Sequence, residues 1–138
     1  MTLITQGTLW LFTCGLIAFE LLILIDKTKA QQFLEAFVKN LRYHFLEQGL
    51  RLIVGVAFVI HSSASQTQET PYIKFFNYLG WAIILSSLLL IILPWRWHQK
   101  FAQTVIPTVV KWIQFYGFLC FLLAAFIMYS LLLNQITY

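Results

Sequence analysis

Residues 75–100 read FFNYLGWAIILSSLLLIILPWRWHQK. The first part, residues 75–93, contains no charged side chain, and it is followed by a proline and a cluster of tryptophan and basic residues. About 20 apolar residues in a helix cross a hydrocarbon core of about 30 Å, and tryptophans gather where that core meets water. This stretch therefore predicts a transmembrane helix over residues 75–93 that ends at the level of the lipid head groups.

The whole chain has the composition of a membrane protein. Hydrophobic residues make up 60% of its 138 residues and charged residues only 10%, well outside the range of a soluble domain. We expect an all-α integral membrane protein, a bundle of four transmembrane helices. The predicted spans are residues 3–25, 49–65, 75–93 and 110–133.

An internal repeat organises these spans. When the chain is offset by 68 residues, Gln31 aligns with Gln99, Phe33 with Phe101, and Gly49 with Gly117. The prediction is a tandem of two units, residues 1–68 and 69–138, each with two spans joined by a linker (residues 26–48 and 94–109). Because each unit contains an even number of spans, both units should enter the membrane in the same direction.

Both linkers carry apolar residues at helical spacing. Between residues 26 and 48 these positions recur every three or four residues, which predicts an amphipathic helix. Its apolar side faces either lipid or protein, as part of the bundle or against a partner. In the second linker we expect Pro107 to break or kink the helix. The predicted interfacial anchors are Phe33, Phe37, Trp95, Trp97 and Trp112.

Basic residues are concentrated in the two linkers. Only Lys74 lies between the second and third spans, and no basic residue precedes the first span or follows the fourth. The positive-inside rule then places both linkers in the cytoplasm and both termini outside. We interpret the net charge of +4 as an attraction to anionic lipid head groups and not to nucleic acid.

Small residues within the spans predict where the helices pack, because small side chains let backbones approach each other in a membrane. Cys14 and Ala18 align with Ala82 and Ser86 in the repeat. The predicted packing residues are Cys14, Ala18, Gly49, Gly55, Ala82, Ser86, Gly117, Cys120 and Ala124.

The second unit resembles a known family. A span followed by Pro94-Trp95-Arg96-Trp97-His98-Gln99-Lys100, a linker with a proline, and a span that opens near Gly117 resembles the small two-span bacterial inner-membrane proteins of the YjeT-like family. Glu20 in the first unit looks like the glutamate in that family's first span. The resemblance covers about half the chain at a time, and it implies a location in the bacterial inner membrane. Together with the distribution of basic residues, this location predicts that both termini are periplasmic.

Glu20 is the acidic residue that lies inside a predicted span. An unpaired carboxylate there is costly, so it is either paired or functional. The repeat replaces Glu20 with Leu88 and Arg51 with Leu119, which predicts that Glu20 and Arg51 form an ion pair. A role for Glu20 in coupling protons or cations is the alternative.

The remaining polar residues form no recognisable catalytic motif, so we expect no enzymatic activity, no metal and no cofactor. His44 and His98 share the cytoplasmic side, and His61 lies near the other end of the second span.

Three functions remain open at this point. The leading hypothesis is an accessory or scaffolding subunit that binds a membrane-protein partner or forms a homo-oligomer. The second is a small transporter coupled to protons or cations through Glu20. The third is an electron-transfer subunit whose haem is held by His44 and His98.

Overall fold

A computed structural model describes residues 3–64 and 71–136, with the side chains of residues 37–39 and 134–136 left out. These residues form six helices and no strand. The helices are α1 (Leu3–Ile25), α2 (Lys27–Lys39), α3 (Leu41–Ala64), α4 (Pro71–Ile92), α5 (Trp95–Lys111) and α6 (Ile113–Ile136). Among the described residues, α1, α3, α4 and α6 are long and apolar enough to cross a membrane. The prediction of an all-α, multi-pass membrane protein is confirmed.

The predicted first linker is two helices and not one. Asn40 ends α2 with an extended backbone (φ −131°, ψ 124°), and its side-chain oxygen accepts a hydrogen bond of 2.9 Å from the backbone N–H of Arg42. Asparagine favours such positions because its short side chain caps the free N–H groups of the helix that follows. Helix α3 therefore begins eight residues before the predicted start of the second span, at Leu41 instead of residue 49.

Helix α5 is also longer than predicted. Pro107 lies inside this helix, which continues to Lys111, so of the predicted break or kink at Pro107 the break is wrong. The helix ends instead at Trp112, whose backbone leaves the helical region (φ −106°, ψ 21°). A proline removes one backbone hydrogen bond, and here the turns on both sides of it remain helical.

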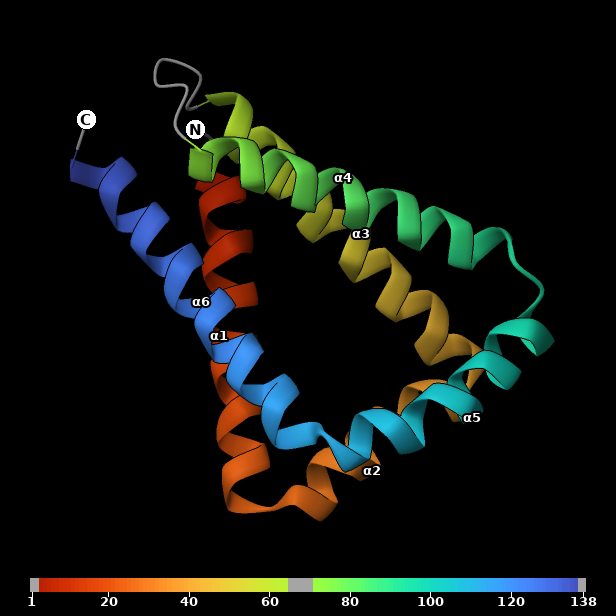
Figure 1. Cartoon of the computed structure of the whole chain (residues 1–138). Coiled ribbons are helices and arrows are strands. Elements are labelled where there is room, and N and C mark those ends of the chain that lie inside the picture. Colours follow the sequence, from red (N-terminus) through yellow and green to blue (C-terminus); the bar gives the residue numbers. More distant parts are fainter. Residues whose placement is uncertain (1–2, 65–70, 137–138) are drawn as a thin grey trace.

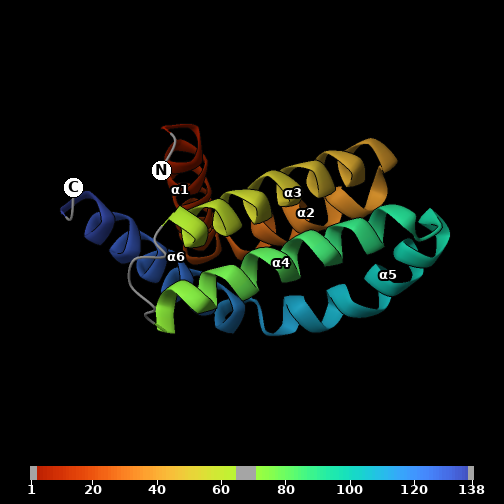
Figure 2. The same ribbon diagram turned by 90° about the horizontal axis from the view of Figure 1, so that it is seen from above.

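The six helices form two closely packed pairs that are closed at one end by the connecting helices. The most extensive contact is between α3 and α4, followed by that between α1 and α6, while α1 also touches α3. Figure 1 shows α6 crossing α1 obliquely, and α3 and α4 close together at one end and farther apart at the other. Helices α2 and α5 contact each other at the opposite end from the start of α1 and the end of α6. In the view from above in Figure 2, α3 and α4 lie next to each other.

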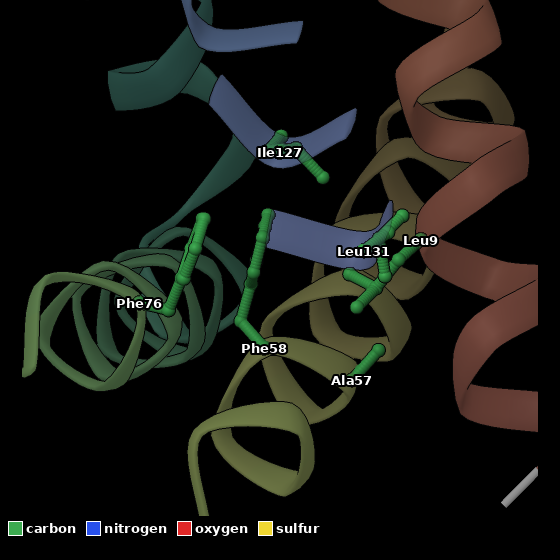
Figure 3. Close-up of a cluster of buried hydrophobic side chains, with 6 residues drawn as sticks. All are labelled: Leu9, Ala57, Phe58, Phe76, Ile127 and Leu131. Carbon is green, nitrogen blue, oxygen red and sulfur yellow. The ribbon is translucent and has the colours of Figure 1, made fainter. Parts of the chain in front are cut away.

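Aromatic and aliphatic side chains form a core where the pairs meet. Phe58 of α3 stacks on Phe76 of α4, with ring centres 5.5 Å apart, and Phe76 stacks in turn on Phe126 of α6 at 5.2 Å. Leu9 of α1 and Leu131 of α6 pack against the same cluster, as Figure 3 shows. All four spans thus contribute to one buried cluster.

Helices α3 and α4 come closest at a pair of glycines. A methyl group on Gly80 would lie 2.8 Å from the carbonyl oxygen of Gly55, and one on Gly55 would lie 3.0 Å from the carbonyl oxygen of Gly80. Each glycine therefore leaves room for the other helix's backbone, and this approach is possible only without a side chain.

Candidate functional site

An apolar groove runs between α1 and α3. Two hollows, of about 420 and 300 Å³, share Thr8 and Ile53 and so form one continuous feature, which we call the α1/α3 groove. Its lining is Ile4, Thr5, Thr8, Leu11, Phe12, Gly15 and Leu16 from α1, and Leu50, Leu52, Ile53, Val54, Val56, Ala57 and Ile60 from α3.

The groove presents little polarity to its surroundings. The Thr8 hydroxyl donates a hydrogen bond of 2.9 Å to the carbonyl oxygen of Ile4, so it is satisfied within its own helix. Leu11 stands at the edge with 76% of its surface exposed. A methyl group on Gly15 would meet no atom within 4 Å, which leaves the α1 backbone open to a neighbour at this point.

The predicted packing residues fall into different surroundings. Gly55, Gly117 and Ala124 are buried, Gly49 and Cys120 are half-buried, and Cys14, Ala18, Ala82 and Ser86 are exposed. The prediction that the four exposed residues pack within the bundle is wrong for this chain. The buried side of α1 instead carries Thr5, Leu9, Thr13 and Ile23, and that of α4 carries Ile73, Phe76, Gly80 and Ser87.

Glu20 is held against α6. Its Oε2 atom is buried and has no hydrogen-bond partner within the described residues. A methyl group at Gly117 would overlap this carboxylate and would lie 2.9 Å from Cδ1 of Ile23. The side chain therefore occupies space that the missing side chain of Gly117 leaves free.

The predicted ion pair between Glu20 and Arg51 is not formed. Arg51 instead makes a salt bridge and hydrogen bond with Glu47, one turn earlier on α3. A partner four residues away on the same helix is within easy reach of an arginine side chain. Glu20 belongs to the α1–α6 pair and faces α6, away from Arg51 on α3. Glu20 and Arg51 thus lie in separate environments, and their joint replacement by leucine in the repeat does not indicate that they pair.

The structure brings His44 and His98 together. Their ring centres are 4.2 Å apart, and the Trp95 ring lies 5.1 Å from His44 and 5.7 Å from His98. Two axial ligands of a haem must stand on opposite faces of the macrocycle, so imidazoles in direct contact do not fit such a site. Burial, then the proximity of His44, lowers the pKa of His98.

The third histidine lies in a different environment. His61 of α3 forms a buried hydrogen bond of 3.0 Å between its Nε2 atom and the hydroxyl of Ser130 on α6. Ser62 also accepts a hydrogen bond of 3.2 Å from the side chain of Asn77 on α4. These bonds join three spans near the ends opposite α2 and α5.

The predicted interfacial anchors are largely exposed. Trp97 is 70% exposed, Trp112 56% and Phe33 50%, and the Phe33 ring lies 5.9 Å from that of Phe19. Trp95 instead covers the two histidines, and the side chain of Phe37 lies outside the described residues. Helix α2 packs on the spans through Ala30, which is buried in a cluster with Ile23 and Ile113. Its apolar side therefore contacts the bundle at Ala30 and the surroundings at the exposed Phe33.

Sequence reasoning missed several residues of these features. Gly15, Gly80 and Gln48 were not singled out, although the first two are glycines inside spans and such residues mark close approaches. Gln48 is fully buried and neither of its amide atoms has a hydrogen-bond partner within the described residues. A polar residue four positions after His44, on the same helical face, was the available signal.

Comparison with known proteins identifies no relative. No family model, no curated protein and no solved structure matches the chain. The resemblance to the YjeT-like family therefore stays a prediction, and the function has to be argued from the features described above.

Proposed function

We propose that this protein is a non-catalytic accessory subunit of a membrane complex, and that its α1/α3 groove receives a transmembrane helix of the partner. The observation that supports this proposal is the groove itself, an apolar feature beside the exposed backbone at Gly15.

The length of the groove suits a helix. On α1 it extends from Ile4 to Leu16, which corresponds to about 18 Å of helix axis, more than half of a hydrocarbon core of about 30 Å. Its lining is apolar over this whole distance, so its occupant has to be apolar as well.

The side chains that line the groove favour a helix over an acyl chain. Thr5, Thr8, Gly15 and Ala57 are small, and small residues allow two helix backbones to approach closely enough for extensive van der Waals contact. Lipid tails gain no comparable advantage from a small residue because they adapt to any apolar surface. Helix α6 already covers the other side of α1, so the helix that fills the groove comes from another chain.

The distribution of charge supports a location and an orientation. Lys27, Lys29 and Arg42 lie on or beside α2 and the start of α3, and Arg96 and Lys100 lie on α5. This end of the molecule faces the cytoplasm in our proposal, next to anionic head groups, with both termini in the periplasm of a bacterial inner membrane.

Site-specific cross-linking in native membranes tests the proposal. A photoreactive amino acid replaces Ile53 in the groove or, as a control, Leu21, which is exposed on α1 outside the groove. We expect the Ile53 probe to cross-link to a peptide within a transmembrane helix of one other protein. In the Gly15→Leu background this product should be lost, because the larger side chain fills the groove. Cys14→Leu is the matched control, since it adds a leucine at the adjacent exposed position and should leave the product unchanged.

The possible outcomes separate the alternatives. Cross-links only to lipid would contradict the proposal, and so would cross-links only to another copy of this chain. Equal cross-linking in the Gly15→Leu variant and the parent would show that the product does not come from a helix seated in the groove.

A second function, a transporter coupled to protons or cations, is favoured by one observation, the buried and unpartnered Oε2 atom of Glu20. Ionisable groups inside a membrane commonly lie on ion pathways. Proton-linked flux in proteoliposomes should then be abolished by Glu20→Gln and retained in Glu35→Gln, a change on the connecting helix α2. Absence of flux in the parent protein, tested against a panel of candidate cations, would count against this function.

A further inference from the structure

A buried polar cluster lies where α5 meets the start of α3. It consists of His44 and Gln48 of α3 and His98 of α5, and we call it the His–Gln cluster. His44 is 2% exposed and Gln48 is fully buried. Within the described residues, the Nδ1 atoms of both histidines and both amide atoms of Gln48 have no hydrogen-bond partner.

Such an arrangement is unfavourable unless something fills it. A buried polar atom without a partner costs about 1–3 kcal/mol, and most buried polar groups in proteins are paired with protein, water or an ion. His44 and Gln48 lie four residues apart on one face of α3, and the His98 ring lies against that of His44, so a single occupant with several bonds would satisfy more of these atoms than separate contacts would.

The chemistry of the donor atoms identifies the kind of occupant. Imidazole nitrogen is a ligand for zinc, copper, nickel and cobalt, and an amide oxygen is a weaker donor that completes mixed sites. We propose that His44 and His98 bind a divalent first-row transition-metal ion through their Nδ1 atoms, with the amide oxygen of Gln48 as a third ligand and water in the remaining positions.

The spacing of the rings is compatible with this proposal. With metal–nitrogen bonds of about 2.0–2.1 Å, the centres of two coordinating imidazoles lie about 4.5 Å apart when the ligands are at right angles and about 5.2 Å apart in a tetrahedral site. The observed separation of 4.2 Å is somewhat shorter than both values, so the two rings have to move apart when an ion binds between them.

Access and charge also suit a cation. His98 is only half-buried and forms the open side of the cluster, while the Trp95 ring lies against both histidines. Glu47 is close enough to His98 to act on it electrostatically, and it supplies negative charge near the site, although Arg51 opposes it.

The site would be weaker than a structural zinc centre. Within the described residues, no group of three or more His, Cys, Asp or Glu side chains could hold a metal ion. With two nitrogens and one neutral oxygen from the protein, we expect affinity in the micromolar range and a readily exchanged ion.

Metal binding by the full-length protein tests the proposal. The chain is purified in mild detergent through an affinity tag without histidine, stripped with chelator, and titrated with Zn²⁺ by calorimetry. We expect one ion per chain. His44→Gln and His98→Gln should each weaken binding about tenfold or more, and Gln48→Leu should weaken it by a smaller factor. His61→Gln is the matched control, because this third histidine lies on a different part of α3, and it should leave the affinity unchanged.

A second measurement needs no variant. Pulsed electron paramagnetic resonance of Cu²⁺ bound to the parent protein should show coupling to the nitrogens of two imidazoles. Absence of saturable Zn²⁺ binding by the parent, binding unchanged in the double variant of His44 and His98, or a Cu²⁺ spectrum with one imidazole or none would each overturn the proposal.

Discussion

The close crossing of α3 and α4 makes Gly80→Ala a sensitive probe of the packing. The added methyl group would lie 2.8 Å from the carbonyl oxygen of Gly55, about 0.6 Å inside ordinary van der Waals contact, and 3.0 Å from Cβ of Phe58. The carbonyl oxygen belongs to the backbone, so no side-chain rotation relieves the overlap, and the two helices have to move apart.

Two opposing effects set the size of the change. Overpacking of this kind costs about 1–3 kcal/mol, while replacing glycine by alanine in a helix returns up to about 1 kcal/mol of backbone propensity. We therefore expect Gly80→Ala to lower the free energy of unfolding by up to about 2 kcal/mol relative to the parent, and by about 1–3 kcal/mol relative to an alanine placed in a helix without overlap. Helix association in membranes depends on close van der Waals contact, so the loss falls directly on the α3–α4 pair.

Gly49→Ala provides the matched control. It makes the same chemical change on α3, but a methyl group there would meet no atom within 4 Å. The free energy of unfolding is measured by titrating the protein in mild detergent with a denaturing detergent and following helical circular dichroism. The Gly49→Ala variant should be as stable as the parent or slightly more so.

The combination of both glycine changes tests the same reasoning further. Once one methyl group has separated the helices, the second has more room, so Gly55→Ala and Gly80→Ala together should cost less than the sum of the single changes. A Gly80→Ala variant as stable as the Gly49→Ala variant would refute the close approach of these two backbones.

Three further outcomes are expected. Asp26 caps α2 by accepting a hydrogen bond from the backbone N–H of Lys29, and this bond lowers the pKa of Asp26. The stabilisation of α2 by the ionised carboxylate is therefore present above the ordinary pKa and is lost as the pH falls through the lowered value. An acid titration followed by circular dichroism should show this loss in the parent but not in Asp26→Asn. In a double-mutant cycle, the losses in free energy of unfolding caused by Glu20→Leu and Arg51→Leu should add within about 0.5 kcal/mol, because these side chains do not pair. A larger coupling energy would support the ion pair predicted from the repeat. Ser130→Ala removes a buried hydrogen bond to His61 and should lower stability by about 0.6–1.7 kcal/mol in the same detergent titration, whereas Ser86→Ala, an exposed change, should have no effect.

The sequence was sufficient to predict four spans, and the bounds of three of them to within a few residues, because hydrocarbon thickness imposes a length that composition reveals. The predicted first span coincides with α1, and the third differs from α4 by a few residues. The second was misplaced because α3 begins in the polar segment before it. The capping preference of Asn40 was visible in the sequence, but hydrophobic periodicity continued across it and masked the boundary.

Which face of each helix packs was harder to predict. The small pair of Cys14 and Ala18 suggested a contact face, yet the structure buries the larger Leu9 on a different side of α1. In a uniformly apolar helix the lipid-facing and protein-facing sides have the same composition, so periodicity carries no information about the direction of packing. The repeat likewise could not tell that Glu20 faces Gly117, because that contact joins α1 to α6 and depends on the three-dimensional arrangement.

The pairing of α1 with α6 has a consequence for biogenesis. Helices α3 and α4 are neighbours in the chain and can pair as soon as both have left the ribosome, but α1 has to wait for α6. At about 5–20 residues per second, synthesis of the segment between Ile25 and Ile113 takes roughly 4–18 seconds. During this time the Glu20 carboxylate has no Gly117 backbone to lie against and faces lipid, water or an insertion factor. The interval in which this nascent chain most needs a membrane chaperone is therefore set by the distance in sequence between two helices that end up in contact.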